Sequence, residues 1–117
     1  MVMSAEKEQG EEYFNFINSL NSESTKYTYA YHLEQFLNYL KTDLHSFLLL
    51  TVKEKEQLII QYLVQYLVQK KVSAPHKNLI LAAIRHACEI NDTVLNWKKI
   101  KRFIRSSQKT GNEIRQR

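Results

Sequence analysis

The chain has 117 residues, a net charge of +5 and only two Gly, one Pro and one Cys. That length suits one domain with a modest core, and a single Cys excludes an internal disulfide framework and fits a reducing cytosol. The apolar runs are too short or too interrupted to cross a bilayer, and the Glu-rich start does not resemble a signal peptide. We therefore expect a cytoplasmic protein. Because there are so few turn-forming residues, we expect the fold to be all-α, a compact bundle of four to five helices.

Charge is distributed unevenly along the chain. Residues 1–23 carry one Lys and five Glu, residues 24–72 carry six basic and four acidic side chains, and residues 73–117 carry ten basic and three acidic ones. This segregation indicates a polyanionic partner for the last third, with nucleic acid as the first candidate and an anionic membrane as the second.

The first half of the chain predicts a flexible acidic leader over residues 1–10, followed by two helices. The first helix covers residues 11–20, and its apolar side carries Tyr13, Phe14, Ile17 and Leu20. A second helix begins after Ser22, a good capping residue, and ends near Lys41. Residues 44–50 then predict a helical turn or a short loop that inserts leucines into the core.

The second half predicts three more helices. Thr51 and Glu54 have the spacing of a capping box and start a third helix, which ends near residue 71. Ser73 and Pro75 start a fourth helix, which ends near residue 90. Asn96 can cap a fifth helix that ends near residue 105. Residues 11–105 therefore form the predicted domain, and residues 106–117, polar and aperiodic, predict a linker or tail.

Three segments carry residues in an order typical of one family. The second helix reads Ser22-x-x-Thr25-x-x-x-Tyr29-x-x-x-Leu33-x-x-Phe36-x-x-Tyr39-Leu40. The fourth reads Ser73-x-x-His76-x-Asn78-x-x-Leu81-Ala82-Ala83-Ile84-Arg85, and the approach to the fifth reads Val94-Leu95-Asn96-Trp97. Together they resemble the core-binding, SAM-like domain of tyrosine recombinases, the phage integrases. His76 stands where the family more often has Thr, and Trp97 replaces its usual Pro.

The resemblance implies a SAM-like bundle that sits on one face of double-stranded DNA at a recombination half-site, with the second and fourth helices near the major groove. In that family the catalytic Arg, Lys, His-x-x-Arg and nucleophilic Tyr belong to a separate C-terminal domain, of which nothing is visible before Arg117. We therefore expect this chain to have no enzymatic activity of its own. The acidic first helix is expected either to meet a neighbouring protomer in a synaptic tetramer or to cover the core.

The fifth helix carries the clearest candidate contacts. At about 100° per residue, its apolar residues share one arc of the helix, and a second arc carries the cations Lys98, Lys101, Arg102 and Arg105. Aligned cations repel one another and favour an anion, so we prefer phosphate contact over a merely solvated face.

The second and fourth helices add further candidates. On the fourth helix, His76, Lys77, Asn78, Arg85 and His86 are candidate contacts, because Asn and Arg suit bidentate contact with adenine and guanine edges. The alternative for Arg85 is an ordinary salt bridge to Glu89, four residues on. On the second helix the candidates are Thr25, Lys26, Thr28 and His32, of which the first two lie at a helix N-terminus that favours anions.

Catalytic and metal sites are not indicated. No segment combines a nucleophile, a base and an orienting group, and the four His and Cys88 lack common zinc spacing, so we expect no catalytic residue, metal or cofactor. We interpret the chain as a nucleoid-associated, sequence-specific DNA-binding domain that positions a separate catalytic domain for integration or recombination. Two alternatives stay open: a stand-alone helical DNA-binding regulator, and a helical protein-interaction module whose basic tail meets an acidic partner.

Overall fold

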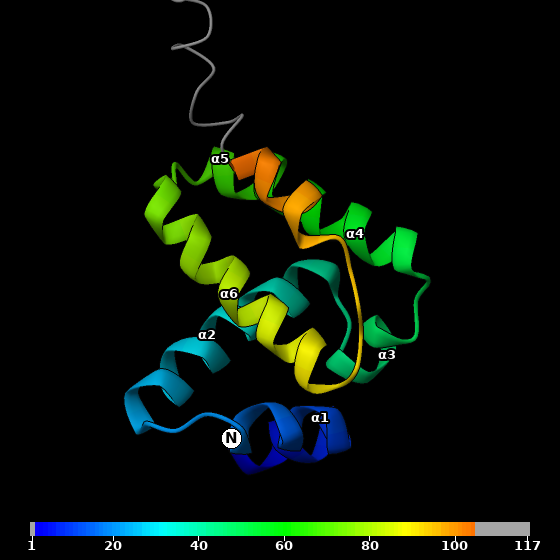
Figure 1. The fold of residues 1–117 in the computed structure, drawn as a ribbon. Helices are drawn as coiled ribbons and strands as arrows, with labels where there is room; N and C mark the ends of the chain where they lie inside the picture. Colours follow the sequence, from blue (N-terminus) through cyan, green and yellow to red (C-terminus); the bar gives the residue numbers. More distant parts are fainter. Residues whose placement is uncertain (1, 105–117) are drawn as a thin grey trace, which may run out of the picture.

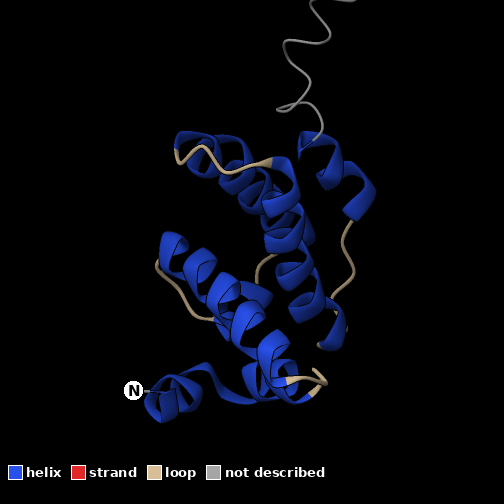
Figure 2. Ribbon diagram, turned by 90° about the vertical axis from the view of Figure 1, so that its left-hand side faces the viewer, coloured by secondary structure: helices blue, strands red, loops and turns tan. Residues whose placement is uncertain are grey.

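A computed structural model describes the backbone of residues 2–104 and the side chains of residues 10–104. All regular structure in this part of the chain is helical, which confirms the predicted all-α class (Figure 1, Figure 2). The elements are α1 (Val2–Asn18), α2 (Glu23–Leu40), α3 (Leu44–Leu48), α4 (Val52–Gln61), the π-helical turn η1 (Tyr62–Tyr66), α5 (Leu67–Gln69), α6 (Ala74–Ile90) and a last, unlabelled helix over 97–104. Arg105 and the predicted tail over 106–117 lie outside the described residues.

Side-chain caps start the helices where the sequence predicts them. The Ser22 hydroxyl accepts the amide N–H of Thr25, and Ser73 does the same for the amide three residues on in α6. At α4, Thr51 and Glu54 form the complete capping box, each side chain bonding the other residue's backbone N–H. Because the caps satisfy amides that lack partners inside the helix, they fix where each helix begins.

The first helix differs from its prediction in two ways. Helical backbone begins at Val2 and is interrupted at Gly10, whose φ of 80° suits glycine, so the predicted leader over 1–10 overlaps α1, and its flexibility stays a prediction. The apolar side is also corrected, because α1 buries Phe16 and leaves Phe14 64% exposed. Tyr13 and Phe16, three residues apart, share the inner face, whereas Phe14 lies about 100° around the helix from Tyr13.

An aromatic cluster occupies the centre of the bundle. The ring of Phe36 on α2 is fully buried, with its centroid 5.3 Å from that of Phe47 on α3 and 5.0 Å from that of Tyr62 on η1. Tyr66 stacks on Tyr62 at 5.2 Å, and Tyr39 lies 5.0 Å from both rings. Edge-on and offset aromatic contacts of this kind stabilise a core beyond the area that they bury.

A buried lysine joins α4 to the segment before it. Lys55 is 5% exposed, and its ammonium donates to the backbone oxygens of Leu48 and Leu50 at 2.9 and 2.8 Å. The charge is therefore hydrogen-bonded although it is buried, as the cost of burying a charge requires. Among residues 2–104, no helix has both the length and the apolar composition needed to cross a membrane.

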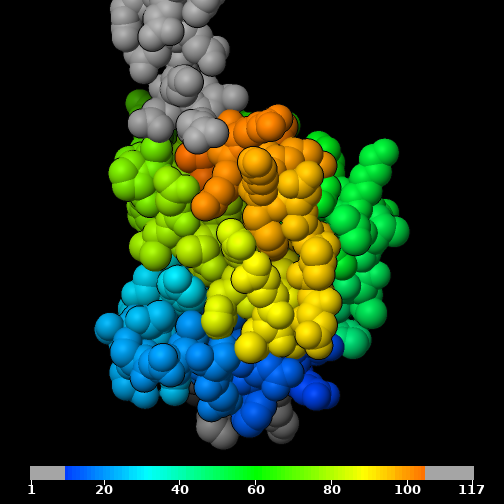
Figure 3. Space-filling model, in the orientation of Figure 1, coloured from blue at the N-terminus to red at the C-terminus, as the bar shows by residue number. Residues whose placement is uncertain are grey.

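The core places α6 and the 97–104 helix on one face of the molecule. Both elements reach the surface there, drawn in yellow-green and orange in Figure 3. Ile84 of α6 and Ile100 of the last helix are completely buried beneath this face. The two helices therefore present their remaining sides together.

Candidate nucleic-acid interface

The 97–104 helix has one buried and one cationic side. Asn96 caps it, because its side-chain oxygen accepts the amide N–H of Lys99 at 3.1 Å. The buried residues are Trp97, Ile100 and Ile104, and the exposed cations are Lys98, Lys99, Lys101 and Arg102. The predicted division of this helix is thus confirmed for the residues that the structure describes. Within the described part of the chain, Lys99 pairs with the Glu56 carboxylate, whereas Lys98, Lys101 and Arg102 make no ion pair.

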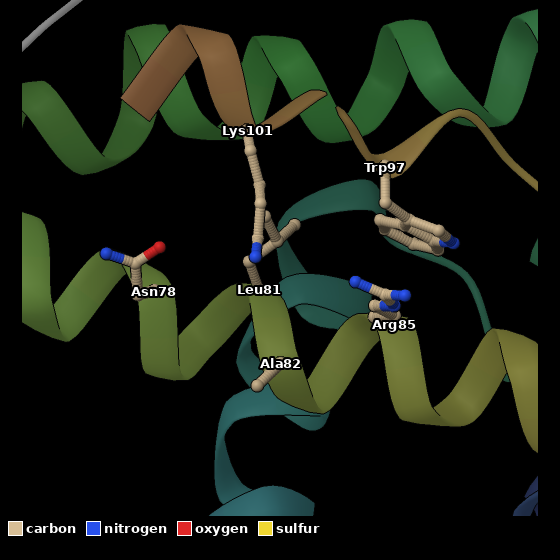
Figure 4. A pocket seen from close by; sticks show the side chains of 6 residues that line it. All are labelled: Asn78, Leu81, Ala82, Arg85, Trp97 and Lys101. Carbon is tan, nitrogen blue, oxygen red and sulfur yellow. The ribbon is translucent and has the colours of Figure 1, made fainter. Parts of the chain in front are cut away.

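A pocket of about 270 Å³ separates the last helix from α6 (Figure 4). We call it the Trp97 groove, and it is lined by Asn78, Leu81, Ala82, Arg85, Trp97 and Lys101. The polar ends of Asn78, Arg85 and Lys101 surround the opening in Figure 4. A hollow of about 460 Å³ shares three of these residues and extends the groove toward Lys98. Donors from two helices therefore converge on one concave surface.

Arg85 is held in a defined orientation within this groove. Its Nε donates to the Glu89 carboxylate at 2.9 Å, and its guanidinium carbon lies 5.9 Å from the centre of the Trp97 ring. The salt bridge that the sequence offered as an alternative is therefore present. It uses only one of the five N–H groups of a guanidinium, so the terminal nitrogens can still donate to a base edge or a phosphate.

Asn78 lies two helical turns before Arg85 on the same side of α6. Its amide nitrogen donates to the backbone oxygen of Ala74 at 3.1 Å. The amide oxygen remains an acceptor, and the side chain is exposed. A residue so placed can accept from a donor on a base edge while Arg85 donates to another.

His86 does not join this surface. Its Nε2 lies 2.6 Å from the hydroxyl of Ser19, and its ring lies 5.8 Å from that of Phe16 on α1 and 6.1 Å from that of Tyr29 on α2. The sequence predicted that His86 would be a DNA contact on this helix, as Arg85 would. The half-buried ring instead packs between α1 and α2, because consecutive residues of a helix point about 100° apart.

The candidates around the α2 and α6 contact are also separate from the groove. His32 is 7% exposed, and its ring lies 5.3 Å from that of His76, so burial first and the neighbouring His76 second lower the pKa of His32. Lys77 is 6% exposed, and burial lowers the pKa of its ammonium. His76 is exposed at the start of α6, and none of the three lines the groove.

The N-terminal turn of α2 forms a further cluster of candidates. Thr25 accepts a hydrogen bond from the Ser22 hydroxyl at 2.8 Å, and the Lys26 ammonium lies 3.6 Å from the Glu23 carboxylate. Thr28 is half-buried on the same helix. Most of the predicted site residues thus fall into three separate groups. One is the groove with its cationic helix, the second is the contact of His32 with His76, and the third is the N-terminal turn of α2.

Three residues that line the groove, Leu81, Ala82 and Trp97, were not among the predicted contacts. Trp97 was expected only to pack, yet its ring also faces Arg85, and Leu81 lines the wall beside it. Their roles depend on the approach of α6 to the last helix, for which the sequence carries no local signal.

No metal or thiol site accompanies the groove. Among the described side chains, no group of three His, Cys, Asp or Glu lies close enough together to hold a metal ion. Cys88 is buried in the core, and burial raises the pKa of its thiol to about 12. The thiol is therefore protonated at neutral pH and is not a nucleophile.

Comparison with protein-family models, with curated proteins and with solved structures found no match to this chain.

Proposed function

We propose that the protein binds double-stranded DNA through the Trp97 groove and the cationic side of the 97–104 helix. The observation that carries the proposal is the convergence of Asn78 and Arg85 from α6 with Lys101 from the last helix around one opening. Exposed cations that lack a carboxylate partner suit phosphates, and the Asn and Arg side chains suit base edges. Phosphate contacts supply most of the affinity in such an interface, and base contacts supply the sequence preference.

The resemblance to the core-binding domain of tyrosine recombinases supports a more specific role. In that role the bundle holds a recombination half-site, and a separate domain performs cleavage and strand exchange. The role predicts a preferred duplex sequence, and it predicts no cleavage by this chain alone. A stand-alone regulator shares the first expectation but needs no catalytic partner domain.

Salt titration with a labelled duplex tests DNA binding. If about six phosphates are neutralised, the logarithm of the association constant falls with the logarithm of salt concentration with a slope of about −5. Polyglutamate serves as the competitor that represents an acidic protein partner. Failure to bind duplex at low salt, or equal displacement by polyglutamate at equal charge, refutes the DNA proposal and favours the protein-interaction module.

Selection from a random duplex library tests sequence preference, and an unenriched pool contradicts it. The recombinase role is tested separately by the coding sequence that follows Arg117. A following domain with the catalytic Arg and Tyr pattern supports it. A preferred DNA sequence without such a domain favours the stand-alone regulator.

A further inference from the structure

Glu56 of α4 connects the bundle core to the start of the last helix. It is 7% exposed and belongs to the helix that Figure 1 places behind the 97–104 helix. One carboxylate oxygen accepts the backbone N–H of Asn96 at 2.8 Å, and the other accepts from the Lys99 ammonium at 2.7 Å. Both partners lie 40 or more residues further along the chain. A single carboxylate therefore satisfies two donors at one helix terminus.

The chemistry of this contact makes it stronger than a surface ion pair. A carboxylate at a helix N-terminus is stabilised by the helix dipole and by unsatisfied amides, and a hydrogen bond to a charged group is about twice as strong as a neutral one. In keeping with this, the bond from Lys99 first and the Asn96 amide second lower the pKa of Glu56. The carboxylate consequently stays ionised at neutral pH.

The contact also decides which cations remain available. Lys99 pairs with Glu56, whereas Lys98 and Lys101 have no carboxylate partner among the described residues. Rotation or detachment of this helix would move Lys101 and Trp97 away from Arg85 and dismantle the groove. The helix otherwise attaches to the bundle through its buried apolar residues, which favour burial but do not fix its rotation as a directional bond does.

We propose that Glu56 is the positioning residue of the DNA-binding surface, holding the 97–104 helix so that its cations and Trp97 face α6. The proposal rests on the proposed function. Glu56 itself touches no ligand and acts through Asn96 and Lys99.

The replacement Glu56→Gln is a useful test, because simple electrostatics and loss of positioning predict opposite changes in DNA affinity. It makes the protein more positive by one charge, so simple electrostatics predicts tighter DNA binding. Loss of positioning predicts weaker binding, because only the docked fraction of molecules is competent and the apparent dissociation constant rises by the inverse of that fraction. Losing a charge-assisted hydrogen bond should lower the equilibrium constant for docking of the 97–104 helix by about tenfold. Glu11→Gln, which adds the same charge at an exposed position of α1, is the matched control.

The fluorescence of Trp97 can report docking of the last helix in the absence of DNA, because Trp97 is the only Trp of the chain and is buried. We expect Glu56→Gln to shift its emission to longer wavelength and to increase its quenching by acrylamide, while far-UV ellipticity is largely retained. Lys99→Gln, which breaks the pair from its exposed side, should give the same change. Lys98→Gln, which removes a charge from the adjacent position, should weaken DNA binding without altering Trp97.

The results separate this proposal from the proposed function. Unchanged Trp97 quenching in both Glu56→Gln and Lys99→Gln overturns the positioning role, as does DNA binding that tightens as in Glu11→Gln. Should Glu56→Gln fail to fold, Lys99→Gln decides alone. Absence of DNA binding by the wild-type protein instead overturns the proposed function, and the Trp97 signal still tests docking.

Discussion

Replacing Lys98, Lys101 and Arg102 together by Gln should change how DNA binding depends on salt. These three side chains are exposed on the last helix and make no ion pair within the described residues. Each phosphate contact contributes about 0.9 to the slope, so removing three should reduce a slope of about −5 to about −2.3. The fold should be kept, because exposed substitutions change the free energy of unfolding by about 0.5 kcal/mol or less.

The difference between the proteins is large enough to measure by fluorescence anisotropy with a labelled duplex. Between about 50 and 200 mM salt, the wild-type affinity should fall about 1,000-fold and the affinity of the triple variant about 25-fold. The control is the double variant Lys41→Gln and Lys53→Gln. It removes two exposed cations outside the groove, one at the end of α2 and one at the start of α4. Equal slopes for the triple variant and the wild type would refute phosphate contact by the last helix.

Three further predictions concern other parts of the molecule. Arg85→Ala should weaken binding to the preferred duplex by about 1–3 kcal/mol and relax sequence preference, as measured by competition between selected and random duplexes; a uniform loss would assign Arg85 to phosphate alone. The His45 and Glu12 side chains lie 2.8 Å apart, and their hydrogen bond raises the pKa of His45 above 6.5 and lowers that of Glu12 below 4.5. At pH 5.5 both groups are largely charged in the folded and in the unfolded chain, so His45→Gln should lower the urea midpoint more at pH 5.5 than at pH 8.5, where the imidazolium is lost; an equal decrease at both values contradicts this. Phe36→Ala removes a fully buried ring and should lower the free energy of unfolding by about 3–5 kcal/mol in urea denaturation, whereas a loss below about 1 kcal/mol would contradict the central place of that ring.

Local patterns in the sequence predicted the helices well, because their causes are local. Ser22, Ser73 and Asn96 cap helices through amides only three residues away, and the same short range governs the capping box at α4. The periodic apolar residues of the last helix likewise pack as predicted. The Arg85 and Glu89 pair could also be read from its spacing of four residues.

Local patterns did not predict the contacts between segments that are distant in the sequence. His86 contacts Ser19 and does not join Arg85. Lys55 is buried and donates to two backbone oxygens, although lysines usually lie on the surface. The burial of Phe16 in place of Phe14 depends on how α1 sits against the bundle. Such outcomes depend on the packing of whole helices, which the periodicity of a single helix does not specify.

The sequence by itself determined the all-α class, the caps and the presence of a cationic side on the last helix, since each follows from residues within a few positions of one another. Only the tertiary structure brought that helix beside α6 to form the Trp97 groove, and only the tertiary structure joined it to Glu56. The physical reason is that a cation's availability depends on whether a carboxylate lies nearby in space. Lys98 and Lys99 are adjacent, chemically identical and both exposed, yet the fold pairs only Lys99 with a buried carboxylate among the described residues.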